Sequence, residues 1–273
     1  MIDMNSVIAI ALNTFRETVR DRVLYAFLIF AVILTFAGIV LGTLSVGQSV
    51  RVLEDIGLFT ISTIGGVIAI FVGTNLVFKE LDKRTIYLIF TKPIRRWQFI
   101  LGKFLGLSLC ILIITALMGG FLMVLTLANG APASSMSNLL AAVGSVYLEL
   151  LLVIALATFF STFATPLMSV IFTIGLWICG HLGQSLMSLG SMSESGAVKV
   201  LFAVIYYALP DLGKLTELRF ELITPPAAGA WSPGAVVGHF GVETLLLLTT
   251  YVLGYVVLLL SLGTLIIERR EFN

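Results

Sequence analysis

Residues 99–128 read FILGKFLGLSLCILIITALMGGFLMVLTLA, an apolar run in which Lys103 is the only charged residue. A hydrocarbon core about 30 Å thick is crossed by about 20 helical residues, each of which rises 1.5 Å. Backbone amides cannot go unpaired in lipid, and a run of this length suits a helix better than the short alternating strands of a barrel. The run therefore predicts a membrane-spanning helix.

Five more runs of similar length occur in the chain. The six predicted spans are about 23–46, 56–78, 99–128, 139–163, 166–189 and 242–267. They predict an all-α membrane protein, with residues 1–273 forming one transmembrane domain and an outer loop at about 190–241.

Composition supports this class. The chain has 273 residues, of which 59% are hydrophobic and 11% charged, whereas a soluble domain would carry about a quarter charged residues. This composition therefore largely rules out a water-soluble enzyme. The net charge of +1 gives no reason to expect a nucleic acid partner. Cys110 and Cys179 both lie in apolar runs, so we expect free, structural thiols.

The distribution of positive charge predicts the orientation. If the chain crosses six times, twelve of its sixteen Lys and Arg residues lie on one side, before the first span, between the second and third, and after the last. Short loops rich in these residues tend to stay in the cytoplasm. Both termini are thus predicted to be cytoplasmic. The other side carries Arg51, Lys199, Lys214 and Arg219.

An amphipathic segment precedes the first span. In residues 7–22 one stripe is apolar and the opposite face is polar; the stripe holds Ile8, Ala11, Leu12, Phe15 and Val19, and the polar face holds Asn13, Arg16, Glu17 and Arg20. This pattern predicts an elbow helix that lies flat at the membrane interface.

A second non-spanning segment lies between the fifth and sixth spans. Its apolar stripe comprises Val198, Leu201, Phe202, Ile205, Tyr206 and Leu209. The run ends at Pro210 and is too short to cross, so it predicts an outer interfacial or re-entrant helix. Residues 210–235 hold four of the seven prolines and are predicted to form an irregular exterior loop rather than another helix.

Catalytic motifs are missing. There are two histidines, His181 and His239, and no H-E-x-x-H motif, while the two Gly-Lys pairs continue with Phe104 and Leu215 instead of the Ser or Thr of a P-loop. We therefore expect no catalytic residue, and any ATP used must be hydrolysed by another subunit.

A metal site is not expected either. Cys179 and His181, with Met187 and Met192, could suggest a soft-metal site near the outer end of the fifth span. Residues two apart on a helix point to different sides, so Cys179 and His181 are poorly placed to share an ion. Ordinary packing is favoured, with His181 meeting water or a polar neighbour.

Glu149 is the only acid placed well inside a predicted span. A buried, unpaired carboxylate is costly in lipid, so Glu149 should face a partner helix or a wet cavity. It could line a translocation path. The alternatives are that it is hydrogen-bonded or neutral, or that the fourth span begins later than drawn.

Two glycine pairs have the spacing that allows helices to approach closely. These are Gly38 with Gly42 in the first span and Gly102 with Gly106 in the third. Packing within the chain is favoured over a subunit interface.

The strongest signal is the charged stretch between the second and third spans. Residues 78–103 mix both charge signs with apolar Ile86, Leu88 and Ile89, and Pro93 breaks the segment. A basic loop that only fixes topology is one interpretation. A docking surface for a cytoplasmic protein is at least as well supported.

These residues resemble the ABC-2 type permeases, in particular the group of the nitrous-oxide-reductase maturation permease. The matching features are Glu80, Arg84-Thr85, Lys92-Pro93, Arg96 and Gly102-Lys103, then Thr14-Phe15-Arg16-Glu17 with Arg20 and Arg22, Gly180-His181-Leu182, and Leu209-Pro210-Asp211-Leu212. The resemblance runs along nearly the whole chain.

The resemblance implies a six-helix half-transporter in a bacterial inner membrane. Its partners would be membrane lipid, a second copy or paralogue, and separate subunits that bind ATP and Mg²⁺; the chain itself would bind no cofactor. The elbow helix and a coupling helix would contact the ATPase. The implied coupling residues are Glu80, Asp82, Lys83, Arg84, Thr85, Lys92, Pro93, Arg95 and Arg96.

The leading hypothesis is the permease subunit of an ATP-driven exporter. An importer is disfavoured because the Glu-Ala-Ala loop of binding-protein-dependent uptake permeases is not found. A membrane anchor that transmits ATPase motion without transport is an alternative. A secondary carrier is disfavoured by the lack of repeats and the few buried charges. The cargo and the choice between homodimer and heterodimer stay open.

Overall fold

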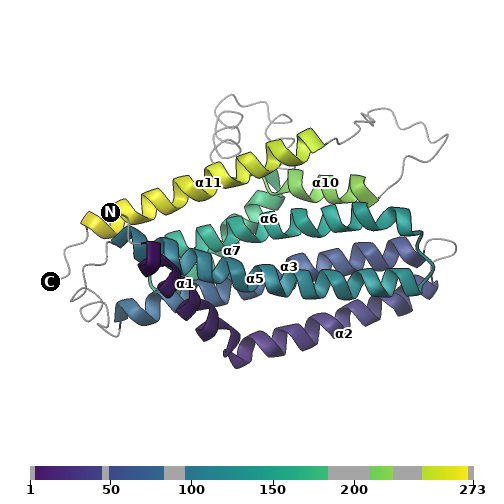
Figure 1. The fold of residues 1–273 in the computed structure, drawn as a ribbon, viewed down its shortest axis with the longest axis horizontal. Coiled ribbons are helices and arrows are strands. Elements are labelled where there is room, and N and C mark those ends of the chain that lie inside the picture. Colours follow the sequence, from purple (N-terminus) through teal and green to yellow (C-terminus); the bar gives the residue numbers. More distant parts are fainter. Residues whose placement is uncertain (1–3, 45–48, 83–95, 184–209, 224–241, 270–273) are drawn as a thin grey trace, which may run out of the picture.

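The computed structural model describes residues 4–44, 49–82, 96–183, 210–223 and 242–269, which are helical almost throughout (Figure 1). The α-helices are α1 (Met4–Val19), α2 (Arg22–Leu44), α3 (Ser49–Asp82), α5 (Arg96–Ala128), α6 (Met136–Ser161), α7 (Pro166–His181), α10 (Gly213–Ile223) and α11 (Val242–Arg269). One 3-10 turn, η1 (Ala133–Ser135), precedes α6, and these ranges contain no strand. The predicted all-α class is confirmed.

Five of these helices are long and apolar enough to cross a membrane, namely α2, α3, α5, α6 and α11. They correspond to five of the six predicted spans. α3 begins at Ser49, earlier than predicted, and takes in the charged residues Arg51, Glu54 and Asp55. A helix can continue beyond the apolar stretch that defines its span, so the charges mark the edge of the apolar run and not the end of the helix.

The predicted fifth span, 166–189, does not form one continuous helix. α7 ends at His181, and its 16 residues rise only about 24 Å, which is short of the hydrocarbon thickness. The helix ends where the chain before α10 packs against Gly180: a Cβ at Gly180 would lie 2.9 Å from the carbonyl oxygen of Pro210. Residues 184–209, which include the predicted outer re-entrant helix, lie outside the described residues.

The prediction of an irregular loop over 210–235 is wrong for residues 213–223, which form α10. Leu212, Leu215 and Leu218 are fully buried and follow helical spacing. The Lys214 N–H donates to the Asp211 carboxylate at 3.3 Å, which caps the first turn. The prolines of this region fall on either side of the helix, so they bound it and do not break it.

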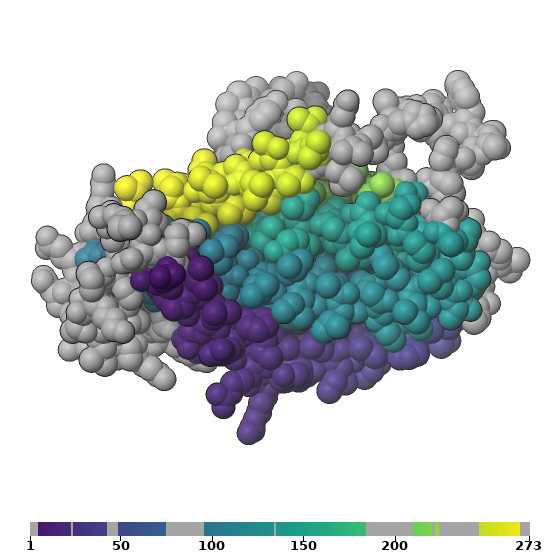
Figure 2. Space-filling view, in the orientation of Figure 1, coloured from purple at the N-terminus to yellow at the C-terminus, as the bar shows by residue number. Residues whose placement is uncertain are grey.

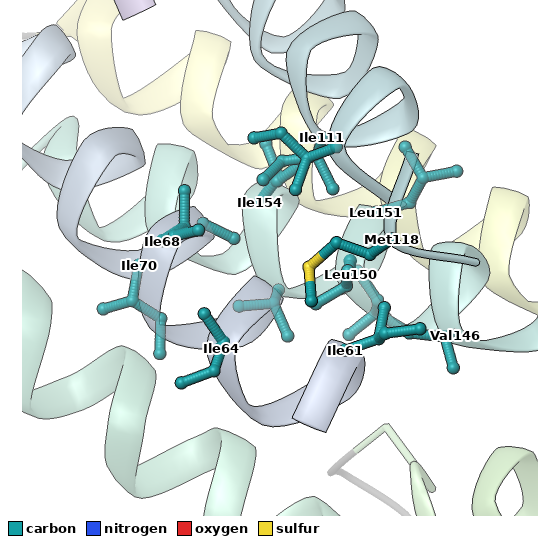
Figure 3. Close-up of a cluster of buried hydrophobic side chains, with 14 of the residues drawn as sticks. Ile61, Ile64, Ile68, Ile70, Ile111, Met118, Val146, Leu150, Leu151 and Ile154 are labelled. Atoms are coloured by element: carbon teal, nitrogen blue, oxygen red, sulfur yellow. The ribbon is translucent and has the colours of Figure 1, made fainter. Parts of the chain in front are cut away.

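The core lies where α3, α5 and α6 pack together. Ile61, Ile64 and Ile68 of α3 meet Met118 of α5 and Leu150 of α6 (Figure 3). α6 is buried on all sides from residue 149 to residue 158, so it is surrounded by other helices and has no lipid-facing side there. α6 and α3 are therefore the central helices of the bundle.

The outer helices present broad apolar surfaces. α2 exposes Phe30, Ile33 and Val40, and α11 exposes Leu247 and Val257. Figure 2 shows α2 and α11 along opposite borders of the bundle, with α5 and α6 between them. Exposed apolar surface on this scale is rare in soluble proteins and matches a hydrocarbon surrounding.

The N-terminal helix packs across the start of α5 (Figure 1). A Cβ at Gly102 would lie 2.8 Å from Ile10 Cβ, and one at Gly106 would lie 2.5 Å from the carbonyl oxygen of Ala11. The glycine pair of the first predicted span, Gly38 with Gly42, also packs against another helix of the chain. A Cβ at Gly38 would lie 3.2 Å from Ile56 Cγ2 of α3. The prediction that these glycines serve intramolecular packing is confirmed.

The α1 residues fall into three faces. Val7, Thr14 and Thr18 are buried, while Ile8 and Leu12 of the predicted apolar stripe are exposed. The buried face of α1 packs closely on the glycines of α5. The exposed apolar face of α1 can contact lipid. Asn13, Arg16, Glu17 and Arg20 are also exposed, on the polar side.

We predict that Gly106→Ala loosens α1 from α5. The new methyl group meets α1 backbone, so the helices must separate, and the expected loss is about 1–3 kcal/mol of unfolding free energy. Gly120→Ala on the same helix is the control because nothing lies within 4 Å of its Cβ position; it should be neutral or stabilising. Thermal unfolding of the purified chain in detergent measures both. Equal stability of the two variants would show that α1 does not depend on this contact.

Candidate functional site

A single carboxylate occupies the centre of the bundle. Glu149 is the fourteenth of the 26 residues of α6 and is 0% exposed. About 20 Å of helix therefore separates it from each end of α6. An ionised carboxylate at this depth is tolerated only if other groups satisfy it.

Four side chains from three helices surround the Glu149 carboxylate. The Ser62 hydroxyl lies 3.1 Å from Oε1 and 3.0 Å from Oε2, and the Trp177 indole N–H donates to Oε1 at 3.1 Å. His181 Nε2 lies 3.2 Å from Oε1, and the Arg219 guanidinium pairs with Oε2. Ser62 comes from α3, Trp177 and His181 from α7, and Arg219 from α10. We call these five residues the Glu149 cluster.

The cluster answers the question that the sequence left open about Glu149. Of the alternatives, hydrogen bonding is what the structure shows, and the apolar helix α6 begins at Met136, before the predicted start of the fourth span. A carboxylate has about four lone-pair positions, and four donor groups occupy them. A role for Glu149 in translocation stays a prediction.

His181 links the carboxylate to the backbone of its own helix. Its Nδ1 lies 2.9 Å from the backbone oxygen of Trp177, and its Nε2 lies 3.2 Å from Glu149 Oε1. The ring is therefore held at both nitrogens, between α7 and the carboxylate of α6.

A cavity of about 390 Å³ adjoins the cluster. Its walls come from α3, α7 and α10; they comprise Asp55, Leu58, Phe59, Ser62, Thr63, Trp177, Ile178, His181, Leu182, Thr216, Arg219 and Ile223. The volume falls within the range of small-molecule sites, which are mostly apolar with a few placed polar groups. The polar side chains of the cluster therefore form one part of a mainly apolar pocket.

Two motifs that are far apart in the sequence meet beside this cavity. A Cβ at Gly180 would lie 2.9 Å from Leu212 Cδ1, and the Asp211 N–H donates to the Tyr251 hydroxyl of α11 at 3.0 Å. The Gly180-His181-Leu182 and Pro210-Asp211-Leu212 segments thus join the end of α7 to the start of α10. This junction holds His181 and Arg219 on the same carboxylate.

The predicted coupling residues are only partly described. Glu80 and Asp82 belong to the last turn of α3, where only the backbone is described. Arg96 begins α5, and its guanidinium donates to the backbone oxygen of Ile267 near the end of α11. The other predicted coupling residues, Lys83, Arg84, Thr85, Lys92, Pro93 and Arg95, lie outside the described residues.

The predicted elbow residues lie apart from the Glu149 cluster. Arg16, Glu17 and Arg20 are exposed and Phe15 is half-buried, all near the end of α1.

The bundle buries more charged residues than the sequence predicted. Lys103 is fully buried on α5, and Arg219 is buried on α10.

Three members of the cluster were not predicted from the sequence: Ser62, Trp177 and Arg219. Arg219 was assigned to an exterior loop, yet it is only 6% exposed. A signal for it existed, because a lone mid-span acid requires a cation and Arg219 lies among leucines at helical spacing.

Metal ligands do not cluster in the part of the chain that the structure describes, where no group of three His, Cys, Asp or Glu side chains converges. Cys110 and Cys179 are free thiols. Met187 and Met192 lie outside the described residues.

We predict that Glu149→Gln lowers the free energy of unfolding by about 3–5 kcal/mol, because it leaves the buried Arg219 guanidinium without its anion. Glu217→Gln is the control, since Glu217 is exposed on α10 and its loss should change stability by less than about 0.5 kcal/mol. Chemical denaturation in detergent measures both. A Glu149→Gln variant as stable as the control would mean that the ion pair does not hold α10 in place.

Comparison with known proteins agrees with this architecture. The family described as ABC-2 family transporter protein matches residues 8–200, well over half of the chain. A search of curated proteins finds no match. The family match and the five long apolar helices identify a multi-pass membrane permease whose family works with an ATP-binding subunit. The chain therefore belongs to the ABC-2 family of transporter proteins.

Proposed function

We propose that this chain is the permease subunit of an ATP-driven exporter in a bacterial inner membrane. It would act as half of a dimer, with a second copy or a paralogue, and a separate subunit would bind and hydrolyse ATP. The chain supplies the pathway and contributes no catalytic residue. Membership of the nitrous-oxide-reductase maturation group stays a prediction from the motifs.

The continuity of α3 is the observation that carries this proposal. α3 runs unbroken from Ser49 to Asp82. One of its ends leads directly into the charged segment 83–95, and its other half forms a wall of the cavity through Leu58 and Ser62. The 20 residues from Ser62 to Asp82 span about 30 Å as a helix. A displacement of the charged segment would therefore reach the Glu149 cluster through one rigid element.

The helix that follows the charged segment 83–95, α5, is held by contacts with two other helices. Arg96, the first residue of α5, binds the Ile267 carbonyl of α11, and Gly102 and Gly106 receive α1. The segment would act as the coupling element, with α1 and the end of α11 moving as one unit with α5. ATP-driven closure of the partner subunits would tilt this unit against α3 and switch access to the cavity.

In place of the predicted fifth span, α7 and α10 would together cross the membrane as two half-helices. α7 ends, and α10 begins, at the contact between Gly180 and Leu212. Broken helices that meet near the midplane are a common way to place backbone ends and charged groups at a transport site. In this proposal, the break allows α10 to move relative to α7 when access switches.

We predict that ATP turnover changes the reactivity of a cysteine in the cavity. Thr63→Cys, placed in a Cys110→Ala, Cys179→Ala background, would be labelled with a membrane-impermeant maleimide in proteoliposomes that contain the co-purified ATPase. Labelling should change at least about threefold between nucleotide-free and vanadate-trapped states, because closure alters access to the cavity. Asn129→Cys, which is exposed at the end of α5, should label equally in both states.

A second variant connects this change to the charged segment. Glu80→Ala combined with Arg84→Ala should abolish the labelling change while ATP hydrolysis continues. A change that persists in this variant would remove the coupling role from the segment. A chain that only anchors the ATPase would show no labelling change in either background, and failure to recover any ATPase would overturn the proposal.

A further inference from the structure

The cavity beside the Glu149 cluster presents mainly carbon to a ligand. Ser62, Trp177 and Arg219 donate to the central carboxylate. His181 is held at both nitrogens, by that carboxylate and by the Trp177 backbone oxygen. Most polar atoms of these side chains are thus engaged within the cluster, and the surface that faces the cavity is overwhelmingly apolar. Such a cavity favours an uncharged, apolar occupant.

The cavity extends along α3. The α3 residues that line it run from Asp55 to Thr63, a stretch of helix that rises about 12 Å. One leaflet of a hydrocarbon core about 30 Å thick is about 15 Å deep. α3 is long and apolar enough to cross a membrane, so the cavity runs in the same direction as the surrounding acyl chains, over most of the depth of one leaflet.

The two ends of this stretch differ. Asp55 follows Arg51 by one helical turn, and Arg51 is exposed about 16 Å along α3 from the Glu149 cluster. The cluster lies near the middle of α6, so Arg51 falls at the level of the headgroups. At the other end the Trp177 ring packs against α3, since a Cβ at Gly66 would lie 3.0 Å from Trp177 Cζ2. The cavity therefore has a charged end towards the membrane surface and an aromatic wall towards the midplane.

The side of the cavity is open at hydrocarbon depth. Phe59, Ile178 and Leu182 line the cavity and are nevertheless 70%, 49% and 47% exposed. Each lies within one helical turn of a member of the Glu149 cluster. An acyl chain of the surrounding bilayer can therefore enter between these apolar side chains without crossing a polar surface.

We propose that this cavity holds one acyl chain of a bilayer phospholipid from the leaflet at the Ser49 end of α3. The headgroup stays at the level of Arg51, the chain enters between α3 and α7, and its terminal methyl group reaches Trp177. The proposal concerns lipid binding by this chain and holds whether the chain transports a substrate or anchors a partner. Its failure would therefore leave the exporter proposal standing.

Photo-crosslinking with phosphatidylcholine tests both the occupant and its direction. The full chain would be placed in nanodiscs with a phosphatidylcholine that carries a diazirine either at the end of one acyl chain or near the ester of that chain. Mass spectrometry of peptides would locate the adducts. The terminal diazirine should label the cavity around Trp177, and the diazirine near the ester should label the region of Asp55 and Phe59. Adducts on exposed α2 side chains such as Ile33 report ordinary contact with the bilayer.

A substitution that fills the cavity provides the matched test. Thr216 of α10 lines the cavity and is half-buried, so the ring of Thr216→Phe would occupy part of the space. Adducts around Trp177 should fall at least about fivefold, which corresponds to about 1 kcal/mol of lost binding, while adducts on α2 stay unchanged. Glu217→Phe is the control because it adds the same ring at an exposed position of α10, and it should leave both sets of adducts unchanged.

Adducts on α2 without adducts in the cavity would overturn the proposal, and this result is also expected if a second copy of the chain closes the opening. Labelling around Trp177 that is stronger from the diazirine near the ester than from the terminal one would overturn it too. So would cavity labelling that Thr216→Phe leaves unchanged. If Thr216→Phe does not fold, the comparison of the two diazirine positions on the unsubstituted chain decides the question by itself.

Discussion

The architecture depends on one constraint, which is that a carboxylate in the middle of a membrane bundle must be paired and fully hydrogen-bonded. Glu149 meets this requirement with a guanidinium, an imidazole, an indole and a hydroxyl. These groups come from three different helices. Removing any of α3, α7 and α10 would take at least one polar partner from the carboxylate, so the cluster favours their placement around α6.

This constraint explains the least regular part of the fold. α7 ends at His181, and α10 begins close to Gly180, so that both helices reach the same carboxylate. The arrangement also places the Glu149 cluster at the edge of a mainly apolar cavity. The same residues that stabilise the bundle therefore also give the cavity its polar end, and α3 links that end to the charged segment.

Five of the long apolar helices could be predicted from the sequence because a run of about 20 apolar residues matches the hydrocarbon thickness and has too few polar groups to face water. The packing roles of Gly102 and Gly106 followed from their spacing. α10 could not be identified in the same way, since four prolines nearby outweighed a short leucine pattern. The cluster was also hidden: its members come from positions 62, 149, 177, 181 and 219, and only a lone buried acid hinted at it. Whether side chains so far apart in the sequence meet depends on how the helices are arranged in space. Short stretches of one sequence do not reveal that arrangement.

A double-mutant cycle between Glu149 and Arg219 tests the central claim most directly. The unfolding free energies of Glu149→Gln, Arg219→Gln and the double variant would be compared with that of the unsubstituted chain. If the pair holds α10 in the bundle, the double variant should lose at least about 2 kcal/mol less than the sum of the single losses. Losses that add to within about 0.5 kcal/mol would contradict the account.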